Sequence, residues 1–167
     1  MRREYIRCAP RWRHGAERRY DTVFVNKDND RPSLLGIDIA RVFLLFSFTY
    51  REILHCCAAV HWFARIDDEP DDQTGMWVVQ PAYHRIGRRK VPLFSVISLD
   101  TIIRASHLIG VSINQEVTER QTASMSLDTF TRFFVNKYID HHAFDLLHIP
   151  SPPLDHTPSN SDVPMSE

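Results

Sequence analysis

The amino-acid sequence predicts an α+β fold that is mainly β, namely a small antiparallel barrel or sandwich with a C-terminal amphipathic helix. Short runs of β-branched and aromatic residues, separated by clusters of Asn, Asp, Pro and Gly, predict strands joined by short loops. Little helical periodicity lies between these runs, which argues against a parallel α/β sheet. The hydrophobic period becomes helical only near the end of the chain.

The first predicted strands form the centre of the fold. Asp21–Val25 is β-branched and aromatic and predicts a short strand. Ile37–Tyr50 alternates, and both of its sides are largely apolar at first, so we expect a strand buried on two faces. Leu54–Ile66 resumes the apolar pattern after a short interruption. The two segments are expected to pair as a long antiparallel hairpin.

Shorter elements follow this hairpin. Further strands are expected near Met76–Pro81, Leu93–Leu99 and Leu108–Ile113. Pro81 ends the first of them or marks a sheet edge, because proline lacks the N–H that a ladder needs. The stretch "HRIGRRKVP" predicts a basic turn, and Ser98 or Asp100 is expected to cap a short helix.

A helix is predicted from about Leu127 to about Leu147, with Ser126 as its N-cap. Its apolar stripe comprises Leu127, Phe130, Phe134 and Tyr138. Among small barrels, an SH3-like or BAH-like one is expected. The predicted division of the chain is a basic N-terminal arm (1–19), one globular domain (20–148) and a disordered Pro/Ser-rich tail (149–167).

Composition limits the class of protein. The chain has 167 residues, 43% of them hydrophobic, which suits one domain with a real core. A net charge of −1 gives no overall attraction to nucleic acid or membrane. Three cysteines, two of them adjacent, predict no disulfide framework. The N-terminus lacks a signal-peptide core and the apolar runs are too short to span a bilayer, so nucleus or cytoplasm is expected.

The stretch "YIDHHAFD" sets an acid beside two histidines. On a helix, adjacent residues are about 100° apart, so Asp140 and the two histidines do not converge on one point. His141, Asp145 and His148 do share a face at spacings of four and seven residues. They predict either a metal or acid–base face or, as the more ordinary interpretation, the solvated end of a helix that leaves the core.

Basic and aromatic residues suggest a binding surface. The candidates for contacting nucleic acid or a partner are Arg11, Trp12, Arg13, Arg88, Arg89, Lys90, Trp62 and Trp77. The cations would bind phosphates in a salt-dependent way. The tryptophans, at the ends of predicted strands, would form an aromatic rim that binds a cation, as in cages for methylated lysine. The alternative for the tryptophans is core packing or cross-strand pairing.

Other chemistry is not indicated. The acidic stretch "DDEPDD" is expected to be a solvated loop, because it lacks the ligand positions and the glycine of a calcium-binding loop. The chain has no G-x-S-x-G elbow, no P-loop and no dinucleotide-binding glycine motif. No cofactor is therefore expected.

The stretches "DTVFV", "VHWF", "TGMWVV" and "VNKYIDHHAF" occur in an order that resembles the C-terminal region of proteins encoded by fungal Plavaka-type DNA transposons, of the Kyakuja–Dileera–Zisupton group. The resemblance covers roughly residues 12–144. "HLIGVSINQ" departs from it, since an "HLIPV"-type segment is expected there. The resemblance implies a transposon-derived protein whose catalytic carboxylates lie in a separate, upstream segment, so none is assigned here. The family's tail motif falls on Asn136, Tyr138, Asp140, His141 and His142.

The leading hypothesis is a non-enzymatic accessory domain of a transposon-derived protein that binds DNA, chromatin or a protein partner. The catalytic part of a transposase is one expected partner, and a membrane is not. One alternative is a metal-dependent hydrolase or nuclease remnant that uses Asp140, His141, Asp145 and His148. Another is a decayed fragment without a selected function.

Overall fold

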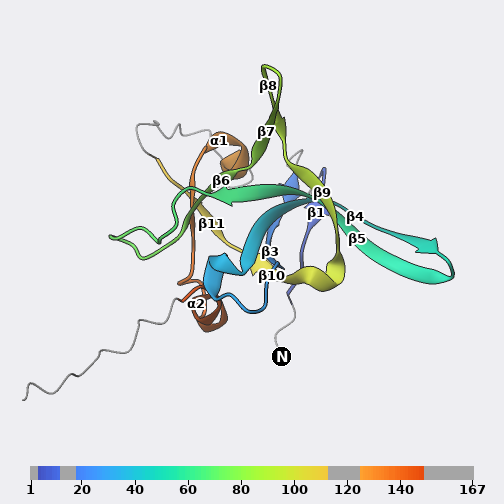
Figure 1. Cartoon of the computed structure of the whole chain (residues 1–167), viewed down its shortest axis with the longest axis horizontal. Helices are drawn as coiled ribbons and strands as arrows, with labels where there is room; N and C mark the ends of the chain where they lie inside the picture. The colour runs from blue at the N-terminus through green and yellow to red at the C-terminus, as the bar shows by residue number, and fades with distance from the viewer. Residues whose placement is uncertain (1–3, 12–17, 113–124, 149–167) are drawn as a thin grey trace, which may run out of the picture.

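The computed structural model describes residues 4–11, 18–112 and 125–148 (Figure 1). The strands are β1 (Cys8–Ala9), β2 (Arg19–Tyr20), β3 (Thr22–Asn26), β4 (Ile37–Tyr50), β5 (Ile53–Arg65), β6 (Val78–Pro81), β7 (Tyr83–Ile86), β8 (Arg89–Pro92), β9 (Phe94–Ser98), β10 (Ile102–Ser106), β11 (Leu108–Gly110) and β12 (Phe133–Val135). The helical segments are η1 (Ser33–Leu35), η2 (Leu99–Thr101), α1 (Ser126–Thr129) and α2 (His141–Leu147). The fold is mainly β, as predicted.

Within the described residues, an eight-stranded antiparallel sheet has the order β10-β3-β4-β5-β6-β12-β11, with β9 added to β5. Its two end strands, β10 and β11, are consecutive in the chain, and only His107 separates them. The His107 carbonyl accepts a hydrogen bond from the Asn136 N–H at 2.8 Å, which ties this corner to β12. The sheet therefore curls into a nearly closed barrel, and the predicted small β-barrel is confirmed.

The long hairpin is also confirmed, since β4 and β5 pair along almost their whole length. The register shifts once, between Val42 and Leu44. Burial on two faces holds only before this bulge. From Leu44 to Tyr50 the strand is largely exposed, because there β4 and β5 leave the barrel as a ribbon that β9 joins only at its base (Figure 1).

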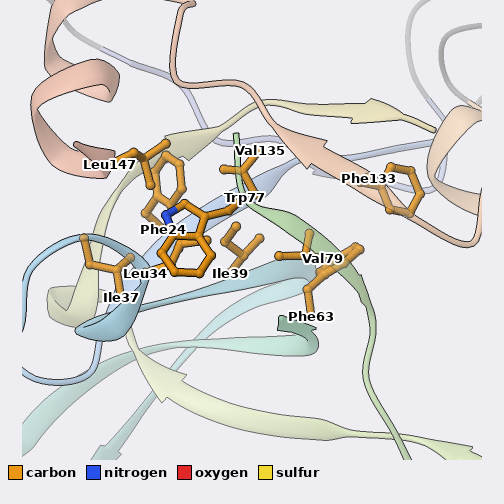
Figure 2. Close-up of a cluster of buried hydrophobic side chains, with 10 residues drawn as sticks. All are labelled: Phe24, Leu34, Ile37, Ile39, Phe63, Trp77, Val79, Phe133, Val135 and Leu147. Atoms are coloured by element: carbon orange, nitrogen blue, oxygen red, sulfur yellow. The ribbon is translucent and has the colours of Figure 1, made fainter. Parts of the chain in front are cut away.

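Alternation along the strands divides the buried residues into two clusters. The cluster inside the barrel, shown in Figure 2, comprises Phe24, Leu34, Ile37, Ile39, Phe63, Trp77, Val79, Phe133, Val135 and Leu147. The cluster on the opposite side of β3, β4 and β5 comprises Val23, Val25, Ala40, Val42, Ala58 and Val60. Removing this much apolar surface from water is the main force that holds the barrel together.

The predicted long C-terminal helix is wrong. The segment instead forms α1, then β12, then α2. In β12, Phe133 pairs with Val79 of β6 and with Gly110 of β11. Pairing with strands distant in sequence outweighs the local helical spacing, because it places Phe133 and Val135 fully inside the core.

Two smaller predictions are corrected. The helix expected at Ser98 or Asp100 is only the three-residue η2, and Ser98 makes no capping hydrogen bond. Residues 4–11 pack against the barrel rather than standing apart as an arm, because β1 pairs with β2 in a separate two-stranded sheet and Ile6 packs on the outer cluster. Strands β6, β9 and β11 lie where they were predicted. The expected disordered tail lies outside the described residues.

Candidate nucleic-acid interface

The hairpin of β7 and β8 stands away from the barrel (Figure 1) and carries the predicted basic residues. It lies between the two strands that share one edge of β5. Strand β9 pairs with Cys57–His61 of β5, and β6 pairs with Phe63–Arg65. Trp62 donates its N–H to the Leu93 carbonyl at 3.1 Å, Leu93 donates to Ala82 at 2.9 Å, and Ala82 donates to Trp62 at 2.8 Å. These three backbone bonds close the base of the hairpin onto the central strand of the sheet.

His61 reinforces this base. Its Nε2 lies 2.8 Å from the Ala82 carbonyl oxygen. The His61 residue as a whole is only 8% exposed. Because a carbonyl only accepts, Nε2 carries the proton in this contact. The ring of Tyr83 packs edge-on against His61 with centroids 5.6 Å apart. The first residue of the hairpin is thus positioned by a buried side chain of the barrel.

The turn of the hairpin has two residues, Gly87 and Arg88, between the paired residues Ile86 and Arg89. Gly87 has a φ of +61°, and Arg88 is not among the positive-φ residues. This is the pattern of a type II′ turn, whose first position favours glycine and whose twist suits a hairpin. The predicted basic turn is therefore a regular two-stranded ribbon.

The hairpin concentrates positive charge. Arg85 lies directly opposite Lys90, and Arg88 and Arg89 follow the turn glycine. All four side chains are exposed, and no carboxylate among the described residues forms an ion pair with them. Like charges directly opposite each other on a sheet repel. An anion between Arg85 and Lys90 would relieve that repulsion.

Sequence reasoning identified Arg88, Arg89 and Lys90 but missed Arg85 and Tyr83. The signal was available in "YHRIGRRKVP". Once Gly87 is placed in a two-residue turn, counting back places Arg85 opposite Lys90. Tyr83 then falls on the same face as these two cations, and it is 51% exposed. The face therefore combines charge with an aromatic ring.

The N-terminal cations are placed differently. Arg11 is exposed, whereas Trp12 and Arg13 lie outside the described residues. Arg19 binds Asp21 at 2.8 Å, and Arg18 lies 3.8 Å from Asp128. These two arginines are partly neutralised by carboxylates of the protein itself. The hairpin is therefore the better exposed group of positive charges.

The predicted aromatic rim of Trp62 and Trp77 is wrong. Trp77 is 1% exposed inside the barrel, where its indole N–H donates to the Ser33 hydroxyl at 3.0 Å. Trp62 is half-buried against the outer cluster, and its indole N–H donates to Ser95 at 2.8 Å. The two rings lie in different clusters, so they do not form a cage. Core packing, the alternative raised from the sequence, is what the structure shows.

The residues of "YIDHHAFD" have a structural role. Asp140 is the N-cap of α2 and accepts the Ala143 N–H at 2.8 Å. It also accepts two hydrogen bonds from Arg104, at 2.7 and 2.6 Å. The bonds from the Arg104 guanidinium, and then the Ala143 N–H, hold the pKa of Asp140 far below its usual range.

His141, Asp145 and His148 do not share one helical face, so the metal or acid–base alternative raised from the sequence is not supported by their arrangement. His141 and Asp145 are exposed on α2, but the helix ends at Leu147 and His148 has extended backbone. His148 stacks on Phe144 instead, with centroids 5.3 Å apart. In residues 4–11, 18–112 and 125–148, no group of three or more His, Cys, Asp or Glu side chains is arranged to hold a metal ion.

Two buried arginines attach the C-terminal segment to the barrel, and sequence reasoning missed both. Arg104 binds Asp140 and also Glu4 at 2.6 Å. Arg41 binds Asp128 of α1 at 2.6 Å, which lowers the pKa of that carboxyl. Arg41 lies on the same side of β4 as Ile37 and Ile39, because alternate residues of a strand point the same way. Its inward orientation could have been predicted from this alternation.

An open cleft of about 570 Å³ lies beside the end of β5, between Ile39, Phe63 and the start of the acidic loop. Its charged lining residues are Lys27, Asp38, Arg65, Asp67 and Asp68. Lys27 and Asp38 form an ion pair at 3.3 Å, and the Arg65 guanidinium lies 5.4 Å from the centroid of the Trp77 ring. In the acidic loop itself, Asp71 accepts from the N–H and the hydroxyl of Thr74 at 2.9 and 2.8 Å. These bonds form a turn, and the expected solvated loop is what this segment shows.

In comparisons with known proteins, no protein-family model, no curated protein and no solved structure matches this chain. Among the described parts of the chain, no helix is both long and apolar enough to cross a membrane. The functional argument for this mainly β protein therefore rests on the geometry of its surface.

Proposed function

We propose that this chain is a non-enzymatic nucleic-acid-binding module that contacts the phosphate backbone through the β7–β8 hairpin. The observation that carries the proposal is the uncompensated charge of this ribbon, in which Arg85 faces Lys90 without a carboxylate partner in the described structure. Phosphates supply the missing negative charge and release their counterions when Lys and Arg neutralise them.

The shape of the hairpin supports DNA as the ligand. A two-stranded β-ribbon fits the major groove of B-DNA. The base of the ribbon is closed by three backbone hydrogen bonds, so it is held in one orientation when it meets the duplex. The transposon resemblance supports the same proposal, because it implies a chain that works beside a separate catalytic segment on DNA.

The test is fluorescence anisotropy with a labelled DNA duplex of about 20 base pairs at about 150 mM salt. The variant Arg88→Gln/Arg89→Gln removes two of the four hairpin cations. Binding is expected to weaken roughly 10- to 30-fold, because two fewer phosphates are neutralised.

The matched control is Lys27→Gln/Arg31→Gln, which changes the net charge equally but lies at the loop between β3 and β4. Both control side chains belong to exposed ion pairs, so little stability is lost. If the hairpin variant binds as tightly as this control, the hairpin is not the contact surface and the proposal fails.

A further inference from the structure

The ribbon formed by the outer halves of β4 and β5 presents one continuous apolar face. The register of β4, β5 and β9 places these side chains on the same side of the sheet. We call this side the ribbon face; it comprises Leu44, Phe46, Phe48, Tyr50, Ile53, His55, Cys57, Ala59, Phe94, Val96 and Ser98. By strand alternation it continues the inner face of the barrel, and Figure 1 shows how β4 and β5 extend beyond the barrel.

Most of the ribbon face is open to solvent. Its most exposed members are Leu44 (54%), Phe48 (48%), Tyr50 (57%), Ile53 (61%), Phe94 (53%) and Val96 (62%). Taking ~200 Å² for one large side chain, these six expose roughly 700 Å² of mostly apolar surface. The largest apolar patch on a typical soluble monomer is about 300–600 Å², so this face is larger than a monomer normally leaves in water.

The ribbon face holds no Asp, Glu, Lys or Arg. Its polar members are the Tyr50 hydroxyl, Ser98 and His55, and the His55 ring stacks on Phe48 with centroids 5.1 Å apart. A two-fold symmetric interface brings the same patch of both subunits together, so a charged patch would repel its own copy. An uncharged face meets its copy without this cost. The oppositely charged Arg51 and Glu52 lie at the tip, in the turn, where the Arg51 guanidinium lies 5.2 Å from the centroid of the Tyr50 ring.

We propose that a second copy of this chain covers the ribbon face, so that the protein is a two-fold symmetric dimer. Two such faces would bury roughly 1,400 Å² in total, within the about 1,200–2,000 Å² of a standard specific interface. Face-to-face packing of sheets about 10 Å apart lets the aromatic side chains of the two copies interdigitate.

The two longer segments outside the described residues suit this face poorly as covers. Residues 113–124 read "INQEVTERQTAS", with two large apolar residues against three charged ones. The last residues, 149–167, are rich in Pro and Ser. Neither supplies the row of apolar side chains that would match six exposed ones. A second copy does, because it carries the same row.

Sedimentation velocity of the full chain at about 10–100 μM tests the proposal. The expected species has twice the chain mass of 19.5 kDa. Ile53→Glu places a charge on the ribbon face and should return the mass to one chain. Leu54→Glu is the matched control, because Leu54 is the next residue, is 64% exposed and lies on the opposite face, across from Thr49. It should remain dimeric.

Val96→Glu tests the other end of the face, on β9, and should also dissociate the dimer. Circular dichroism checks that each variant is folded. If Val96→Glu unfolds, Ile53→Glu still tests the proposal, because Ile53 lies at the exposed tip of the ribbon. A wild-type protein that sediments as a single chain overturns the proposal. So does equal dissociation by Ile53→Glu and Leu54→Glu. DNA binding by the hairpin is measured separately, so either idea can fail alone.

Discussion

Replacing Asp140 by Ala tests the structural role assigned to the acid of "YIDHHAFD". The change removes two contacts at once. The N-cap bond to the Ala143 N–H is lost, and so are both hydrogen bonds from Arg104. The Arg104 side chain is only 6% exposed and keeps Glu4 as its remaining charged partner.

The magnitude follows from these contacts. Losing an N-cap costs about 1 kcal/mol. Breaking a buried ion pair costs about 3–5 kcal/mol. The Asp140 side chain is 39% exposed, so solvent screens its attraction to Arg104. We therefore take a cost for the ion pair below the lower end of that range. We expect a total loss of about 3 kcal/mol in the free energy of unfolding.

The assay is urea unfolding followed by circular dichroism, with Asp145→Ala as the control. Asp145 is on the same helix and exposed, so its replacement should change the free energy of unfolding by less than about 0.5 kcal/mol. Equal effects of the two substitutions would refute the assignment of Asp140 as cap and anchor.

Two further predictions concern the pH dependence of the Asp140 contacts and the packing of Trp77. Because the pKa of Asp140 is lowered in the folded protein, its stabilising contribution is complete above the unfolded value of about 3.9 and is lost as pH falls through the folded pKa. Asp140→Asn, which keeps the cap, should therefore differ from wild type in urea unfolding at pH 7 and progressively less below about pH 4; a constant difference would contradict the linkage. Trp77→Phe removes the donor to Ser33 and leaves a cavity in the core, so a loss of about 2–3 kcal/mol is expected by the same assay. A near-neutral Trp77→Phe would mean that this ring is not packed as described.

The central hairpin could be predicted from sequence because its signal is local and long. Alternating apolar residues run through Ile37–Tyr50 and resume at once in Leu54–Ile66, so pairing in space follows from proximity in the chain. The barrel followed from the same kind of evidence, as strand after strand was separated only by short loops.

The C-terminal segment could not be predicted in the same way. The spacing of Leu127, Phe130 and Phe134 fits a helix, and only partners distant in sequence decide otherwise. The true helix was marked by Asp140, an N-cap residue that precedes Ala143 by three positions. That signal was overlooked because Asp140 was placed inside a longer predicted helix, Leu127 to Leu147.

The burial of Trp77 could have been predicted from the sequence. In "MWVVQ", the polar Gln80 is exposed and marks the solvent side of the strand, so Trp77 and Val79 share the opposite, inward side. The cations of the candidate site were predictable in kind, and their arrangement becomes predictable once the turn is placed. Their pairing across β7 and β8 depends on one turn glycine, Gly87.

The salt dependence of DNA binding tests the central claim most directly, because it counts the phosphates that the hairpin neutralises. For duplex DNA the slope of log K against log salt is about −0.9 per phosphate, so four hairpin cations predict about −3.6. Arg88→Gln/Arg89→Gln should reduce it to about −1.8, while Lys27→Gln/Arg31→Gln leaves it unchanged. Identical slopes for wild type and the hairpin variant would contradict the account.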